Sequence, residues 1–157
     1  MPSHFTTTRS GDALPPEISS LLTEQPLAVL ATQNQGQPHV SLVAFAAGAD
    51  GRQLFFATTR TSRKYANLQA DPRATLLIDS RTRSRADFHQ ALALSAKGLV
   101  REVSGVDRET AARLFLAKHP HLQEFVGSPS CALMALEVQL YDLASRFQQV
   151  LTYRLSP

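Results

Sequence analysis

The residues best suited to chemistry form the run TTRTSRK at positions 58–64, where a β-rich segment gives way to a helical one. Ser62 is a favourable N-cap, so Arg63 and Lys64 fall in the first turn of a predicted helix. A helix N-terminus already carries partial positive charge, and two cations there are unfavourable unless an anion neutralises them. Free backbone N–H groups, the Ser62 hydroxyl and both cations could together bind one phosphate. A surface helix whose charges are simply solvated is the alternative interpretation.

The distribution of charge favours a small anionic ligand over nucleic acid. The chain has a net charge of +3, yet the segment from Arg60 to Arg85 alone carries seven basic residues against two acidic ones. Nucleic-acid binding usually needs a broader basic surface than this. A local concentration of cations fits a phosphorylated small molecule, with a solvated basic face as the other interpretation. We therefore expect no nucleic-acid partner.

The elements that must position these residues are mostly strands. Residues 1–15 are polar and are predicted to form a flexible arm, and residues 16–157 a single domain. Turns too short for a crossover join most of the predicted strands, which favours antiparallel pairing and a mainly β barrel with inserted helices. Helices are predicted from Pro16 to before Pro26, over residues 62–70 and 107–118, with a further turn at 122–126. Strands are predicted over residues 27–32, 40–45, 54–58, 74–78, 91–103, 132–141 and 147–155.

Two strings of the sequence resemble the flavin-binding split barrels related to pyridoxamine 5′-phosphate oxidase. They are LAVLATQNQGQPHVSLVAF and GRQLFFATTRTSRKYANLQADPRATLLID, and the likeness runs from Leu27 to Val103. The resemblance implies a six-stranded antiparallel split β-barrel of the FMN-binding type. It also implies a homodimer with FMN in two clefts at the subunit interface. Its most specific part comprises Thr58, Ser62, Arg63, Lys64, Leu68 and Asp71-Pro72-Arg73.

The same resemblance assigns cofactor-binding roles residue by residue. Arg63 and Lys64 match the ligands of the FMN phosphate, and Thr58 matches a hydroxyl near it. The strand from Ser41 matches one whose backbone follows the isoalloxazine ring. Gln90, predicted to open the fifth strand, corresponds to a glutamine that contacts the flavin, although the preceding loop differs in length. The implied cofactor-binding residues are Ser41, Leu42, Val43, Thr58, Ser62, Arg63, Lys64 and Gln90.

The sequence also departs from the oxidase. Ser41 and Ala46 stand where the oxidase has Arg and Lys, so a phosphate ligand is lost. Arg60, or one of Arg81, Arg83 and Arg85, could replace it, and the loop with the last three could fold over the cleft. The chain has no Trp, and residues 145–150 do not match the substrate-binding segment of the oxidase. We therefore expect flavin binding but not oxidation of pyridoxamine phosphate.

The sequence thus predicts an FMN-dependent oxidoreductase whose substrate and catalytic residues it does not identify. The alternatives are a non-catalytic flavin, deazaflavin or heme-binding protein of the same fold. A lone Cys131 excludes a cysteine-based zinc site, and His119 and His121 are interpreted as the end of a helix, so no metal is expected. No apolar run is long enough to span a membrane and no apolar leader is visible. The expected location is the cytoplasm.

Overall fold

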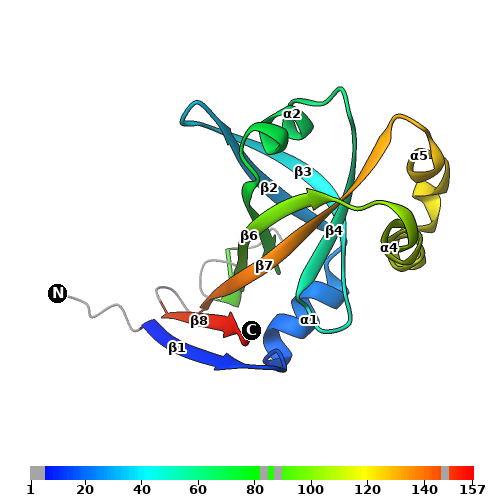
Figure 1. Ribbon diagram of the computed structural model, residues 1–157. Coiled ribbons are helices and arrows are strands. Elements are labelled where there is room, and N and C mark those ends of the chain that lie inside the picture. Colours follow the sequence, from blue (N-terminus) through cyan, green and yellow to red (C-terminus); the bar gives the residue numbers. More distant parts are fainter. Residues whose placement is uncertain (1–5, 82–84, 87–89, 146–148) are drawn as a thin grey trace.

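Six strands close into a barrel in which every neighbouring pair is antiparallel (Figure 1). The computed structural model describes residues 6–81, 85–86, 90–145 and 149–157. The strand order is β7-β4-β3-β2-β5-β6, and β6 pairs with β7 to complete the circle. This confirms the predicted six-stranded split barrel. The six strands are β2 Leu27–Asn34, β3 Gln37–Ala47, β4 Gln53–Thr59, β5 Arg73–Asp79, β6 Ala93–Glu102 and β7 Cys131–Ser145.

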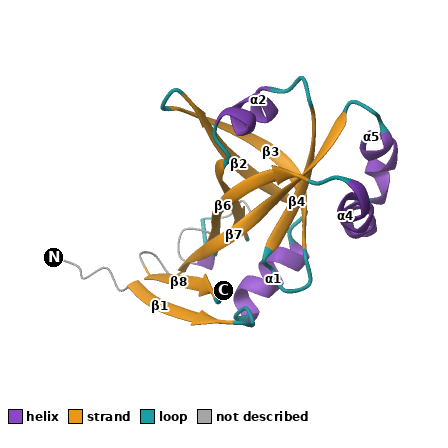
Figure 2. Cartoon of the chain, in the orientation of Figure 1, coloured by secondary structure: helices purple, strands orange, loops and turns teal. Residues whose placement is uncertain are grey.

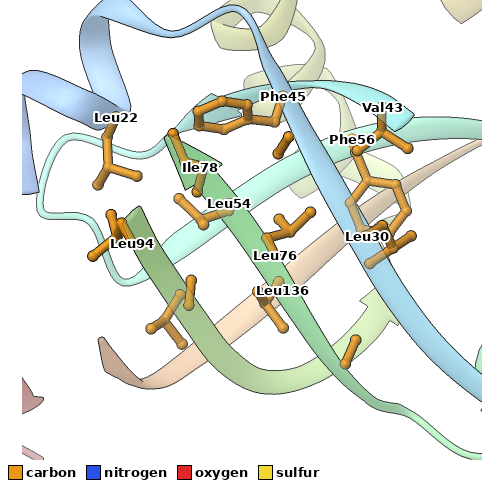
Figure 3. Packing of buried hydrophobic residues seen from close by; sticks show 14 of the residues in the cluster. Leu22, Leu30, Val43, Phe45, Leu54, Phe56, Leu76, Ile78, Leu94 and Leu136 are labelled. Carbon is orange, nitrogen blue, oxygen red and sulfur yellow. The ribbon is translucent and has the colours of Figure 1, made fainter. Parts of the chain in front are cut away.

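Alternating side chains fill the barrel. Along β3 and β4 the inward positions include Phe45, Leu54 and Phe56, and all three are fully buried. They meet Leu30 of β2 and Leu76 of β5 in one apolar cluster (Figure 3). Burying a side chain of this size is worth about 1.5–3 kcal/mol, so this cluster is the main source of the barrel's stability.

Helices cover the barrel at its ends and on one outer face (Figure 2). The helix α1 Pro16–Glu24 contributes three buried residues to the core, Ile18, Leu21 and Leu22, and begins at Pro16 as predicted. The others are α2 Arg63–Ala70, α4 Gly105–Lys118 and α5 Gln123–Gly127, with a 3₁₀ turn at Pro120–Leu122. A second apolar cluster joins α4 and α5 to the outside of the barrel. In the described part of the chain, none of the helices combines the length and apolarity that a membrane crossing requires.

A pair of strands extends the sheet beyond the barrel. The strand β8 Gln149–Leu155 is antiparallel to β7, and β1 Thr6–Gly11 is parallel to β8. The prediction of a loose arm is therefore wrong for residues 6–11. The segment TTTRSG is exposed along almost its whole length, so backbone pairing holds it in place and no apolar alternation marks it in the sequence. The Tyr153 hydroxyl also donates a 2.6 Å hydrogen bond to Ala13 O.

Candidate functional site

A cleft opens where β3 and β4 part. The two strands pair only at Phe45–Ala47, opposite Leu54–Phe56. Residues 37–44 of β3 pair with β2, and residues 57–59 of β4 pair with β7. The space left between them has a volume of about 360 Å³. The described residues that line it are Leu42, Val43, Ala44, Ala57, Thr58, Thr59, Ser62, Lys64, Phe115, Leu122 and Phe125.

Hydroxyl groups and one amine gather at the α2 end of the cleft. Ser62 is the N-cap of α2, as predicted, and its Oγ accepts a 3.2 Å hydrogen bond from the Tyr65 N–H. The same Oγ lies 2.7 Å from Thr58 Oγ1, so the two hydroxyls share a hydrogen bond. Lys64 is half-buried and lines the cleft, whereas Arg63 is exposed and does not. This end can therefore offer an anion two hydroxyls, one ammonium group and the start of a helix.

The β3 side of the cleft contains Leu42 and Val43 but not Ser41. Side chains alternate along a strand, so Ser41 lies on the same face as Val43 and Phe45, toward the barrel interior. Its Oγ is buried, and it is the only buried side-chain oxygen or nitrogen of the described residues that lacks a hydrogen-bond partner. The side chain of Ser41 therefore does not replace the phosphate ligand that the oxidase has there.

Gln90 lies elsewhere in the protomer. Gln90 is helical, its N–H donates a 2.9 Å hydrogen bond to Ala86 O, and β6 begins only at Ala93. The prediction that Gln90 opens the strand is therefore wrong. Gln90 lines a different cavity, of about 760 Å³, next to β1 and β8. Within one protomer the structure does not bring it together with Lys64.

The arginines expected to replace the missing cation have other partners. Arg60 Nη2 donates a 2.7 Å hydrogen bond to Glu102 Oε2, and Arg60 Nη1 donates one of 2.8 Å to Pro129 O. Arg81 pairs with Asp79 at 2.9 Å, at the end of β5. Neither arginine lines the cleft. Arg85 is exposed, and Arg83 lies outside the described residues, so the predicted folding of this loop over the cleft stays a prediction.

The opposite wall of the cleft is apolar, and no motif in the sequence marks its residues as part of the site. Phe115 of α4, Leu122 of the 3₁₀ turn and Phe125 of α5 form this wall. Helical periodicity reveals that Phe115 packs inward, but it does not reveal which strands Phe115 meets. A cleft with this wall and a hydroxyl- and amine-rich end suits a flat ring that carries an anionic tail.

The described lining of the cleft offers no usual ligand for heme iron. None of the described residues that line it is His, Cys, Met or Tyr. His119, which follows α4, is buried, and its Nε2 lies 2.8 Å from Phe45 O in a hydrogen bond. Cys131 is also buried, and burial raises the pKa of its thiol. Among the described residues, no group of three or more His, Cys, Asp or Glu side chains could hold a metal ion.

The family of the chain follows from its sequence match. Residues 14–143 match the family model for pyridoxamine 5′-phosphate oxidase. The match covers most of the chain, which therefore belongs to the pyridoxamine 5′-phosphate oxidase family, and the resemblance seen in residues 27–103 is confirmed. The strands β1 and β8 lie outside the matched residues. No curated protein is significantly similar to the chain in sequence.

Solved structures share the fold at low sequence identity. A heme-binding protein from Mycobacterium smegmatis superposes with a TM-score of 0.77 at 15% identity, over 90% of this chain and 59% of that one. ChuZ of Campylobacter jejuni gives a TM-score of 0.73 at 14% identity, over 85% of this chain and 56% of that one. An FAD-binding protein from Mesorhizobium loti gives a TM-score of 0.65 at 16% identity, over 80% of this chain and 87% of that one. The chain thus spans little more than half the length of the first two, and all three likenesses establish the fold alone.

Proposed function

We propose that this protein binds FMN in the cleft between β3 and β4 and acts as a flavin-dependent oxidoreductase. The observation that carries the proposal is the composition of the cleft, where Thr58, Ser62 and Lys64 stand at one end and an apolar wall faces them. FMN has the matching shape, a phosphate tail and a flat ring, and it supplies the hydride and electron chemistry when bound. Membership of the pyridoxamine 5′-phosphate oxidase family supports this choice.

The residues of the cleft would then have separate tasks. Lys64 would neutralise the phosphate, and the Ser62 and Thr58 hydroxyls would bond its oxygens. Phe115 and Phe125 would exclude water from the ring. Ser41, Leu42 and Val43 keep the role that the resemblance implies, a strand whose backbone follows the ring. Arg63 is exposed, so its share in binding the phosphate would be smaller than that of Lys64.

We further propose a homodimer that completes the cleft. Four large apolar side chains of β2, β3 and β5 are exposed on one outer face: Leu27 at 47%, Val40 at 62%, Leu42 at 65% and Leu77 at 36%. Leu42 lines both the cleft and a cavity of about 480 Å³ on this face. A second copy that covers the face would therefore reach the edge of the cleft. Such a copy could bring to the cofactor Gln90, which lies away from the cleft within one protomer, or the loop that contains Arg81, Arg83 and Arg85.

A specific observation favours flavin over heme, since none of the described residues that line the cleft is a usual ligand of heme iron. A deazaflavin that carries phosphate would suit the same anionic end and is the remaining alternative cofactor. A protein that holds flavin without turnover is the alternative function. We also retain the cytoplasm as the proposed location, on the evidence of the lone cysteine.

The test is reconstitution of the purified protein with FMN, riboflavin and hemin, followed by absorbance and fluorescence titration. We expect FMN to bind at least about tenfold more tightly than riboflavin, because charge-assisted hydrogen bonds to the phosphate are worth about 1.5–3 kcal/mol each. Equal affinities would show that the phosphate is not held, and a Soret band with no flavin bound would favour heme. Anaerobic mixing of the FMN complex with NADH or NADPH then separates an oxidoreductase, whose flavin bleaches, from a protein that only binds.

A further inference from the structure

Glu102, the last residue of β6, joins the two segments on either side of Ser62. Its Oε2 accepts the 2.7 Å hydrogen bond from Arg60 Nη2, and its Oε1 accepts one of 2.8 Å from the Tyr65 hydroxyl. Arg60 precedes the N-cap of α2, and Tyr65 lies in the first turn of that helix. One carboxylate therefore contacts both sides of the anion-binding end of the cleft, with one donor on each oxygen.

Two further hydrogen bonds connect Arg60 to the turn that precedes β7. Arg60 Nη1 donates to Pro129 O at 2.8 Å, and the Arg60 N–H donates to Ser130 O at 3.1 Å. The guanidinium is thus held away from the cleft, and its charge neutralises Glu102. A neutralised carboxylate does little to repel a nearby phosphate. The hydrogen bond to Glu102 also raises the pKa of Tyr65, which keeps its hydroxyl a donor.

Tyr65 transmits this restraint to the groups that line the cleft. Its N–H donates to Ser62 Oγ, and Ser62 Oγ in turn shares a hydrogen bond with Thr58. A shift of Tyr65 would therefore move the Ser62 hydroxyl and the neighbouring Lys64. Groups fixed before a ligand arrives bind it more tightly, because little side-chain entropy is lost on binding.

We propose that Glu102 is a positioning residue for phosphate recognition: through Arg60 and Tyr65 it sets the placement of Ser62 and Lys64. The inference rests on the proposed function, since it concerns the same end of the same cleft. It makes Glu102 a determinant of the preference for FMN over riboflavin, although Glu102 does not itself line the cleft.

The test compares the affinities of FMN and riboflavin in Glu102→Ala, Tyr65→Phe and the wild type. We expect Glu102→Ala to weaken FMN binding about tenfold, because a charge-assisted network is lost, and to leave riboflavin binding within about twofold. Tyr65→Phe removes one of the two contacts and should weaken FMN binding about threefold. The control is Glu137→Ala, since Glu137 accepts hydrogen bonds from Arg101 and Gln53 away from the cleft. The control should leave the ratio of the two affinities unchanged.

An unchanged ratio in Glu102→Ala would overturn the inference. Tighter FMN binding would also overturn it, because it would mean that Glu102 withholds Arg60 from the phosphate. If Glu102→Ala does not fold, Glu102→Gln and Tyr65→Phe carry the test, as both preserve side-chain size. A wild type that binds FMN and riboflavin equally would instead contradict the proposed function, so the two failures are distinguishable.

Discussion

Thr58 and Ser62 share a hydrogen bond of 2.7 Å between their hydroxyl oxygens, which joins the end of β4 to the N-cap of α2. Ser62 Oγ accepts the Tyr65 N–H at the same time, so the Ser62 proton is available to donate. The turn between strand and helix is thereby held by side chains as well as by backbone. The two hydroxyls reach the cleft as one unit.

Replacement of Ser62 should therefore affect stability even without a ligand. Ser62→Ala removes the N-cap and leaves Thr58 without this partner, which should lower the free energy of unfolding by about 1 kcal/mol. Urea unfolding of the ligand-free protein measures the change. Ser62→Thr, which keeps the hydroxyl, is the control and should recover most of the loss. Equal stability of wild type and Ser62→Ala would mean that the cap contributes nothing.

The two adjacent cations should differ in their contribution to FMN binding. Lys64 lines the cleft and Arg63 is exposed outside it. Lys64→Met should weaken FMN binding about tenfold or more, as expected for a charge-assisted contact, and Arg63→Met should weaken it less. Quenching of FMN fluorescence on titration gives both constants. Equal losses of FMN affinity in the two variants would indicate that Arg63 also contacts the phosphate, as the resemblance implies.

A single tryptophan can report on the apolar wall, because the chain has none of its own. Phe125 lines the cleft and is 37% exposed, whereas Val106 is 76% exposed and does not line the cleft. Energy transfer to a flavin falls steeply with distance. FMN should therefore quench the emission of Phe125→Trp by a larger fraction than that of Val106→Trp. Equal quenching would argue that the ring lies elsewhere.

The exposed apolar face should control assembly. Leu42→Glu places a charge where we propose that a second copy packs, and a buried unpaired charge is strongly unfavourable. The wild type should sediment at twice the 17.2 kDa mass of the chain, and the variant at that mass. Val106→Glu, at an exposed position of α4, is the matched control and should remain dimeric. A dimer that survives Leu42→Glu would place the interface on another face.

Asp71 should make stability depend on acid pH. Arg73 bonds its carboxylate at 2.6 Å through Nη2, and this hydrogen bond holds the pKa of Asp71 far below its usual range. Because the pKa is lower in the folded than in the unfolded protein, the ionised carboxylate stabilises the fold at pH values above the unfolded pKa of about 3.9. This stabilisation is lost as the pH falls below that value. Asp71→Asn should therefore melt below the wild type at pH 7, and the difference in Tm should shrink below about pH 4. Glu109→Gln, which removes an exposed carboxylate, should show no such change.

The sequence predicts the barrel better than it predicts the site. Apolar runs and short turns identify the six strands, and Ser62 with its two cations marks the start of α2. Thr58, Ser62 and Lys64 do meet in one cleft. Partners distant in sequence could not be foreseen, because no local pattern reveals that Glu102 bonds to Arg60 or that Phe125 lines the same cleft as Leu42.

Features that no motif encodes explain the remaining differences between the prediction and the structure. Ser41 lies on the barrel side of β3 because side chains alternate, and motif matching alone does not reveal that orientation. Gln90 is helical and precedes the start of β6 at Ala93. The polar β1 is held by its backbone, so methods that rely on apolar periodicity miss it.

The pairing of β1 with β8 affects the order in which strand pairs can form while the chain is synthesised on the ribosome. Thr6 lies opposite Val150, so β1 has to wait until β8, more than a hundred residues later in the chain, has been synthesised. The pairs among β2, β3, β4 and β5 need no residue beyond Asp79 and can form much earlier. Contacts between segments so far apart in sequence form slowly, because a long loop must close first. During synthesis β1 is therefore an unpaired strand, and its polar, arginine-containing sequence helps to keep it from aggregating.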